Sequence, residues 1–347
     1  VTAAYNNRLT PAVADTSAKY ITLPTGPTTT FSTDFTRFAY NIGSNLLVTA
    51  PGAFSQADRT VIKGAMALPQ ITPSYYITPK VSFQSNTYNV TPYNPVGAPA
   101  AHGFTIPTFS LDSGLAFERD AAELKGFFGR DMLLTMEPRA FYVYTPFESQ
   151  AQTPLFDTAD AGFGVSQIFS ENTFVGNDRI ADNNKLTGGI TSRMIEANTG
   201  AERANVTLAQ RQAFTGQKVG LNGTIANPTT YYSDTLGSAS VRLLGNFSTD
   251  IFGQYNTQLN RLVQTTVGGS WRPTPGRSLN FGYRNVWTPP IQASVQNNQA
   301  FVPAATTTDQ YNVSGQWPTS REVSVLGRWG YDALTTKTLN TLVALEW

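Results

Sequence analysis

Alternation of apolar and polar residues recurs along the whole chain and constrains its fold more than any other feature. Residues 322–331 read EVSVLGRWGY, in which Val325 and Trp329 fall on one side of an extended strand and Arg328 falls on the other. Residues 278–284, SLNFGYR, alternate in the same way. Side chains of a β-strand point to opposite faces with a period of two. Each such segment therefore forms a ribbon with one apolar and one polar face.

The residues on the two faces are typical of a membrane barrel rather than of a soluble sheet. The polar faces carry Asn, Gln, Ser, Thr, Arg and Gly in strand after strand, and the apolar faces are rich in Tyr, Phe and Trp near strand ends. Only 14% of the residues are charged, against roughly 25% in soluble globular domains. This combination is typical of a transmembrane β-barrel with a water-filled lumen.

The pattern predicts an all-β fold, an antiparallel transmembrane β-barrel. No apolar run approaches the roughly 18 residues that a membrane helix needs, whereas in a barrel only every second residue contacts lipid. Turn residues separate about 14 to 18 expected strands. Nothing in the sequence marks a second domain, so we expect residues 1–347 to form one barrel segment. The predicted strands include 132–145, 161–169, 186–196, 202–214, 277–287 and 321–331.

Charge and composition exclude several classes of function. The net charge is +1, which argues against a nucleic-acid partner bound through its phosphates. The chain contains no Cys, so a disulfide, a thiolate nucleophile and a Cys-bound metal are not available. Its one histidine, His102, lies in a stretch that predicts a loop, and only Ser110 or Asp112 could be recruited beside it for proton transfer. We therefore expect no enzyme, no cofactor and no metal site.

The middle of the chain carries a set of motifs in a fixed order. They are DSGLAFER (112–119), EPRAFYVYTP (137–146), PLFD (154–157), GNDRI (176–180) and TGGITSR (187–193). This block resembles the barrel of the lipopolysaccharide-assembly family of the Gram-negative outer membrane, the LptD or organic-solvent-tolerance family. The resemblance is strongest over residues 105–215.

The resemblance implies a function and several partners. Members of that family have a periplasmic jelly-roll domain that receives lipopolysaccharide, followed by an integral outer-membrane barrel of about 26 strands. A plug lipoprotein of the LptE type sits inside the barrel. The lipid leaves sideways between the first and last strands, and the saccharide passes through the lumen. The implied partners are therefore lipopolysaccharide, the plug lipoprotein, the periplasmic transport bridge reached through the jelly-roll domain, and outer-membrane lipids.

The chain departs from that pattern at both ends. It opens at Val1 with no room for the jelly roll, and it stops at Trp347 before the adjacent Cys pair and last strands of the family. We expect it to be the central part of the barrel, with the lateral gate outside it. The terminal aromatic residue, with Val343 and Leu345 at alternate positions, also resembles the insertion signal that ends complete bacterial barrels. A general diffusion porin is the alternative function, and it would need an inward constriction loop with clustered Arg facing Asp or Glu.

The charged residues of the motifs are the candidate site. Glu137 and Arg139 lie two apart on one predicted strand, and both should point inward because an Arg or Lys facing lipid costs roughly 2–4 kcal/mol. Asp178 and Arg179 should lie in a loop, since the residues around them break the alternation. The lumen-facing or loop-network candidates are Asp112, Glu137, Arg139, Asp157, Asp178, Arg179, Arg193 and Glu202.

Two interpretations of residues 157–184 follow. The segment lines the route of the saccharide, or an ion-pair network of Asp178, Arg179, Arg193 and Glu202 fastens it as a loop. In either case we predict that Arg179 is buried and paired with a carboxylate. The candidates for that carboxylate are Asp178, Asp182, Glu137 and Glu202.

The alternation also predicts which side chains share a face. We expect the apolar set to face lipid and the arginine set to face the lumen. The apolar set is Leu243, Trp271, Phe281 and Trp329, and the arginine set is Arg139, Arg193, Arg242, Arg272, Arg284 and Arg328.

Overall fold

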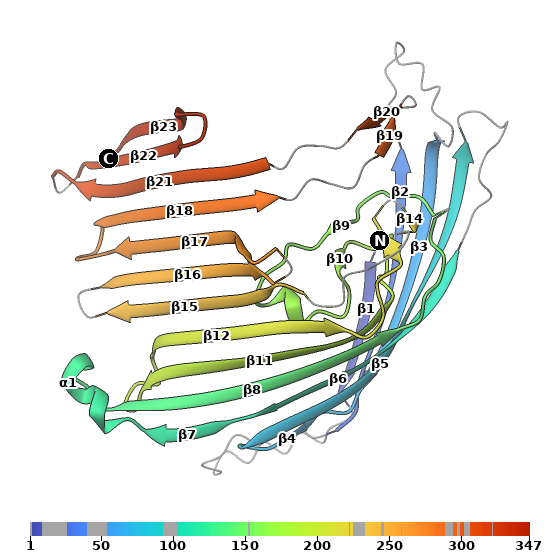
Figure 1. Ribbon diagram of the computed structural model, residues 1–347, viewed down its shortest axis with the longest axis horizontal. Coiled ribbons are helices and arrows are strands. Elements are labelled where there is room, and N and C mark those ends of the chain that lie inside the picture. The colour runs from blue at the N-terminus through green and yellow to red at the C-terminus, as the bar shows by residue number, and fades with distance from the viewer. Residues whose placement is uncertain are drawn as a thin grey trace. The chain divides into compact units, whose positions relative to one another are not determined.

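The computed structural model of the chain is built almost wholly from antiparallel strands, as Figure 1 shows. It forms two compact units. Unit 1 comprises Val1–Leu115, Arg139–Gly188 and Arg211–Tyr232, and unit 2 comprises Ala116–Pro138, Gly189–Gln210 and Ser233–Trp347. The structure describes residues 2–8, 26–39, 54–92, 103–151, 153–221, 223–224, 233–243, 246–257, 259–288, 294–296, 299–301, 306–320 and 322–347. His102 therefore lies outside the described residues.

The helices of the described residues are short. They are η1 (Ala122–Leu124), α1 (Lys125–Phe128) and η2 (Gln167–Phe169). Among the residues described, no helix has the length and apolar character that crossing a membrane requires.

Unit 1 is a series of long antiparallel strands that pair in chain order. Each of β1, β2, β3, β5 and β6 pairs with the next, β6 pairs with β8, and the short strand β4 extends the edge of β5. The bounds are β1 (Thr2–Arg8), β2 (Thr28–Ala39), β3 (Phe54–Ala67), β4 (Gln70–Ile71), β5 (Tyr75–Pro92), β6 (Phe104–Leu115) and β8 (Met132–Thr145). The strands β8, β11 (Asn183–Glu196) and β12 (Glu202–Ala213) contribute residues to both units.

The two faces of unit 1 differ as the alternation predicts. On β5, Val81 and Phe83 are exposed, whereas Gln84 is half-buried and Asn86 and Tyr88 are buried. The polar face is not open, because the connection between β8 and β11 lies against it. A sheet with an apolar exposed face and a polar covered face is the reverse of a soluble sheet packed on a hydrophobic core.

Unit 2 is an antiparallel meander, whose neighbouring strands appear side by side in Figure 1. β7 pairs with β8, and β12 pairs with β15, which is followed in order by β16, β17, β18, β21, β22 and β23. The bounds are β7 (Phe117–Asp120), β15 (Thr235–Leu243), β16 (Phe247–Asn256), β17 (Arg261–Trp271), β18 (Ser278–Thr288), β19 (Ser294–Gln296), β20 (Gln299–Phe301), β21 (Thr306–Pro318), β22 (Ser324–Asp332) and β23 (Lys337–Glu346).

The register of this meander confirms the predicted division of side chains between faces. Residues directly opposite each other share a face. One row is polar and runs Arg242, Ser248, Ser270, Asn280, Ser314 and Arg328. The row one residue away is apolar and runs Leu243, Phe247, Trp271 and Leu279. By the same period of two, Arg272 and Arg284 share the polar face, while Phe281 and Trp329 share the apolar one.

Most strand bounds follow the alternation, and the largest departure lies between β8 and β11. The prediction of a strand over 132–145 is confirmed, but the strand predicted over 161–169 is wrong. That region holds η2 and ordinary loop, and the flanking strands β9 (Ala159–Asp160) and β10 (Phe174–Val175) have two residues each. The segment is held by side-chain contacts rather than by a strand ladder. The hairpin of β13 (Val219–Gly220) and β14 (Gly223–Thr224) is equally short.

Candidate functional site

The connection between β8 and β11, residues 146–182, lies on the polar face of β3, β5 and β6, and we call it the insert. It is held mainly by polar groups of those strands. Lys63 Nζ donates to Asn177 Oδ1 at 2.6 Å, and Ser110 Oγ donates to Glu171 Oε1 at 2.6 Å. Lys80 Nζ pairs with the same glutamate at 3.0 Å. The polar side chains of three strands are therefore used to bind a segment of the same chain.

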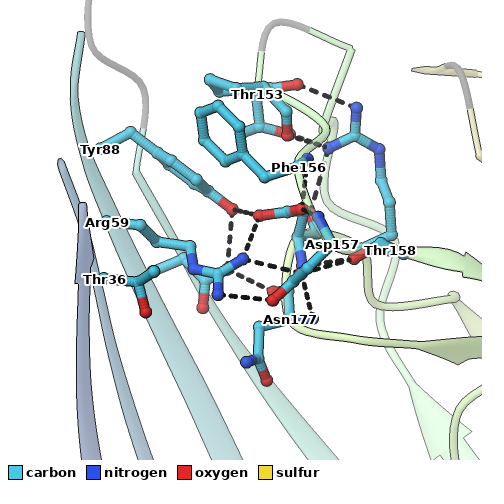
Figure 2. Close-up of polar contacts among 12 residues, drawn as sticks. Thr36, Arg59, Tyr88, Thr153, Phe156, Asp157, Thr158 and Asn177 are labelled. Carbon is cyan, nitrogen blue, oxygen red and sulfur yellow. Dashed lines mark hydrogen bonds and ion pairs between the residues drawn. The ribbon is translucent and has the colours of Figure 1, made fainter. Parts of the chain in front are cut away.

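Arg59 of β3 is the centre of this contact. Its guanidinium donates through Nη1 and Nη2 to the two carboxylate oxygens of Asp157, at 2.8 and 2.6 Å, and through Nη1 to Asp178 Oδ1 at 2.6 Å. Figure 2 shows this fork between the strand and the insert. Arg59 is only 1% exposed. A planar guanidinium suits such bidentate pairing, and its hydrogen bonds lower the pKa of Asp157 to about 2.

Asp178 is fully buried and each of its oxygens is bound twice. Oδ1 accepts from Arg59 and from the hydroxyl of Tyr88 at 3.1 Å. Oδ2 accepts from the backbone N–H groups of Phe156 and Asp157 at 2.6 and 2.9 Å. A carboxylate with no exposure is stable only when its charge is neutralised and its lone pairs are used. The four donors meet that requirement, so Asp178 fixes the insert both to the strands and to itself.

Aromatic side chains cover the charged cluster. Phe156 of the insert stacks on Phe38 of β2, with ring centroids 4.1 Å apart and planes 9° apart. The Arg59 guanidinium lies 5.0 Å from the centroid of the Phe38 ring. A cation over an aromatic face gains more when both are removed from water. Beside these rings, Tyr88 packs with the apolar cluster of Phe104, Ile106 and Ile180.

The glycine of the Gly-Asn-Asp-Arg-Ile motif is required by the geometry of the insert. Gly176 has a φ of 86°, a conformation that side chains rarely adopt. A Cβ built on it would lie 2.3 Å from the carbonyl oxygen of Asp157. The close approach lets the N–H of Asn177 donate to Asp157 Oδ1 at 3.1 Å. The motif therefore places its aspartate and its backbone donors on the same charged cluster.

Arg179 is buried as predicted, at 3% exposure, but the predicted carboxylate partner is wrong. Its guanidinium donates to Thr153 O at 2.8 Å, to Pro154 O at 3.1 Å and to Leu221 O at 3.0 Å, and also to the hydroxyl of Thr153. Among the described residues no ion pair includes it. Asp178 is taken by Arg59, and Asp182 accepts from backbone N–H groups instead. Arg179 therefore binds together three stretches of irregular backbone.

Asp112 and Arg139 form a pair between neighbouring strands of unit 1. The guanidinium donates to both carboxylate oxygens, at 2.9 and 2.6 Å, and the hydroxyl of Tyr76 donates to Oδ1 at 3.1 Å. The same guanidinium lies 4.3 Å from the ring centroid of Phe169 in the insert. The first two motifs of the sequence thus meet on one face, beside the second half of the insert.

Glu137, Arg193 and Glu202 form a separate group in unit 2. Arg193 Nε donates to Glu137 Oε1 at 3.1 Å, and its Nη1 donates to Glu202 Oε2 at 2.9 Å. The three side chains are 29–40% exposed. The single network predicted from Asp178, Arg179, Arg193 and Glu202 is therefore wrong: Arg193 and Glu202 do not bind the insert, because the strands that carry them hold them against Glu137.

Sequence reasoning missed the two strand residues on which the insert depends, Arg59 and Tyr88. The alternation contained the signal, since Arg59 and Lys63 share one face of β3 with an even spacing. The alternation predicts this strand over residues 60–68, which excludes Arg59, whereas β3 begins at Phe54. In the described part of the chain, no group of His, Cys, Asp or Glu could hold a metal ion. The buried charges of the site are bound to each other and to backbone groups.

Comparison with known sequences identifies close relatives. A family profile described as LptD, LPS transport system D, matches residues 14–323. An LPS-assembly protein LptD from Cupriavidus pinatubonensis is 42% identical over 293 residues, covering 84% of this chain and 35% of that protein. A protein of the same name from Ralstonia nicotianae is 39% identical over 319 residues, covering 91% and 37%. The chain thus spans about a third of the length of these relatives.

Comparison with solved structures gives weaker likenesses. FpvA of P. aeruginosa, in a structure with a bound heterologous pyoverdine, is 13% identical with a TM-score of 0.38, over 99% of this chain and 51% of that one. The ferric enterobactin receptor PfeA of the same organism is 10% identical with a TM-score of 0.37, over 89% and 49%. Scores of this size carry no argument about fold or ligand.

Proposed function

The chain belongs to the LptD family of LPS transport proteins, and from that premise we propose that it forms the central part of the barrel that assembles lipopolysaccharide at the outer leaflet. It is an all-β, integral outer-membrane segment. In the proposed mechanism the apolar faces contact membrane lipid. The polar faces provide a wet surface along which the hydrophilic saccharide passes, while the acyl chains leave sideways at a gate outside residues 1–347.

One observation of the structure supports this proposal beyond the family match. The face of unit 1 that carries Arg59, Lys63 and Lys80 is covered by the insert, while large apolar side chains such as Phe83 and Phe109 are exposed on the other face. Exposed apolar area of this extent is stable only against lipid or a partner. A polar interior with an ordered segment on its wall suits a barrel wide enough to pass a saccharide.

The proposed role of the insert is structural rather than chemical. Its central carboxylate, Asp178, is buried and is paired with the buried Arg59 of β3. A porin constriction instead needs charges of opposite sign that face each other across open water, so we do not propose the porin alternative. We also propose that transport proceeds without a covalent step in this segment, with energy supplied from the periplasmic side.

The proposed partners follow from the family. A plug lipoprotein of the LptE type would occupy the polar side of the full barrel, and the periplasmic bridge would reach it through a jelly-roll domain in the longer protein. Support for both comes from family membership alone.

Depletion of the full-length protein in its native host tests the function. Newly made lipopolysaccharide should fail to reach the cell surface, as measured by surface labelling, and should accumulate behind the outer membrane. Uptake of small hydrophilic solutes should be unchanged at early times. Normal surface lipopolysaccharide together with a fall in solute uptake would contradict the proposal and favour a porin.

A further inference from the structure

Unit 2 also contains an arginine-rich cavity. It has a volume of about 700 Å³ and lies at the ends of β15, β16, β17 and β18. Four arginines line it, together with serines of the polar row. The lining includes Arg203, Arg242, Arg272, Arg277, Ser248 and Ser270.

The positive charge of this cavity is only partly neutralised. Arg203 pairs with Glu196, and Arg277 lies 5.0 Å from the ring centroid of Trp317. In the part of the chain that the structure describes, Arg242 and Arg272 make no ion pair. Clustered like charges repel each other and lower stability. Glu202 interacts electrostatically with Arg242, which leaves Arg272 with no carboxylate partner among the described residues. An anion in the cavity would neutralise the remaining positive charge.

The cavity is also held in a defined geometry. Arg272 and Arg277 flank a tight hairpin turn whose Gly276 has a φ of 79°, and Pro273 and Pro275 restrict the backbone between them. Ser248 and Ser270 are directly paired on the polar face. The buried hydroxyl of Ser270 has no hydrogen-bond partner among the described residues. Arg272, Arg277 and the unpaired hydroxyl of Ser270 therefore line the same cavity.

We propose that this cavity binds the phosphate groups of a phosphorylated glycolipid headgroup. The proposal rests on the proposed function, since lipopolysaccharide is the anion-bearing substrate that such a barrel would meet. Guanidinium groups bind phosphate through paired N–H donors, and several of them bind a multiply charged headgroup better than a single phosphate. The cavity would then select the phosphorylated saccharide by charge rather than by sugar identity.

Its position in unit 2 fits an entry point. The connections at this end of the meander, after β15, β17 and β21, have at most six residues. The other end has two short connections, 257–260 and 333–336, but it also has the longest one, residues 289–305 between β18 and β21. Outer-membrane barrels have short turns on the periplasmic side and longer loops outside. The cavity therefore faces the compartment from which lipopolysaccharide arrives.

Binding to the purified full-length protein with its lipoprotein partner tests the cavity. The probe is the phosphorylated saccharide released from lipopolysaccharide by complete deacylation, titrated by calorimetry against wild type and R242Q/R272Q/R277Q. We expect the affinity of the triple variant for the saccharide to be at least tenfold lower than that of wild type, a difference of about 1.4 kcal/mol. The matched control R284Q removes an arginine of the same polar face outside the cavity, and it should bind like wild type. The same saccharide after phosphatase treatment should bind both proteins equally weakly.

Further arms separate the competing explanations. Inorganic phosphate should compete with the saccharide in wild type, but only at much higher concentration. If phosphate binds while the saccharide does not, the cavity holds a free anion only and the proposal is overturned.

The proposal is also overturned if the triple variant, shown to be folded by heat-modifiable migration, binds the saccharide as tightly as wild type. Loss of the lipoprotein from the triple variant, with saccharide affinity intact, would assign the arginines to a protein partner. Failure of wild type to bind intact lipopolysaccharide at all would instead contradict the proposed function.

Discussion

At the scale of single residues, Arg59 determines how the insert is attached. Its guanidinium contacts both Asp157 and Asp178; Arg59 and Asp178 are buried, whereas the side chain of Asp157 is 36% exposed. Buried ion pairs add little net stability compared with apolar residues of the same volume, but loss of one partner is costly because the remaining charge stays buried. The cluster therefore fixes the position of the insert, while it adds little to the net free energy of folding.

Replacing Asp178 should release the insert. Asp178→Ala leaves two backbone N–H groups, the Tyr88 hydroxyl and part of the Arg59 charge without an acceptor, and we expect a cost of roughly 3–5 kcal/mol. Protease cleavage within the insert of the folded full-length protein should then become much faster. Asp131→Ala is the control, because its pair with Lys125 is more than half exposed and is worth about 0–1 kcal/mol. Equal cleavage rates in D178A and wild type would show that the cluster does not hold the insert.

Two glycine substitutions test whether the tight turn at Gly176 is needed for assembly. Gly176→Ala forces a Cβ to 2.3 Å from a carbonyl oxygen at a φ of 86°, so we expect a loss of at least about 1–3 kcal/mol. Gly162→Ala is the matched control within the insert, because a Cβ there meets no atom within 4 Å. The measurement is the fraction of protein that reaches the folded, heat-modifiable form. If the two variants assemble equally well, the tight turn is not needed.

At the scale of elements, the insert behaves as one docked unit whose attachment depends on ionised carboxylates. The pKa of Asp157 is about 2, lowered first by its hydrogen bonds to Arg59, while an unfolded aspartate has a pKa of about 3.9. A lowered folded-state pKa gives stability that is complete above the unfolded pKa and is lost as the pH falls through the folded one. The attachment should therefore persist at mildly acidic pH.

Pepsin cleavage gives a direct measurement of this dependence. Cleavage of the insert should stay slow down to about pH 4 and increase as the pH falls toward about 2. Asp157→Asn removes the titrating group, so its contribution to the pH dependence should vanish and the insert should already be cleaved faster at pH 5. A wild-type transition centred well above pH 4 would contradict the assignment to Asp157.

Sequence reasoning captured the strands better than it captured the insert. The alternation predicts β8 at its observed bounds and the polar row through Arg242 and Arg328, because strand faces depend on local spacing alone. The partners of the insert depend on residues far away along the chain, such as Arg59 for Asp178. Arg179 shows the remaining difficulty: a buried guanidinium was expected to need a carboxylate, but backbone carbonyl oxygens of irregular segments meet the same need.

At the scale of the whole molecule, both units divide their side chains in the same way. The exposed face carries residues such as Phe83 and Val81 in unit 1 and Phe281 and Trp271 in unit 2. Polar residues fill the alternate positions of the same strands. This common division is what an integral membrane strand requires, and it is a property of the register rather than of any single residue.

An added positive charge should impair assembly when it lies on the apolar face of β18 and should be tolerated when it lies on the polar face. Phe281→Arg puts a guanidinium on the apolar face and should cost roughly 2–4 kcal/mol if that face contacts the middle of the bilayer. Asn280→Arg, one residue away on the polar row, should be tolerated. Both can be measured in the full-length protein as the assembled fraction in outer-membrane preparations. Equal assembly of the two variants would show that the apolar face does not contact lipid.

The position of the Arg59 cluster also restricts the order in which the protein can be built. Arg59 is separated from Asp157 by 98 positions and from Asp178 by 119, and β5, β6 and β8 lie between them in the chain. If β3 folded before the insert was in place, the Arg59 guanidinium on its polar face would have no carboxylate from the insert, and the cluster that buries it would be incomplete. We therefore expect β3 to reach its final packing only when the insert docks. The early strands and the insert should then fold as one assembly step.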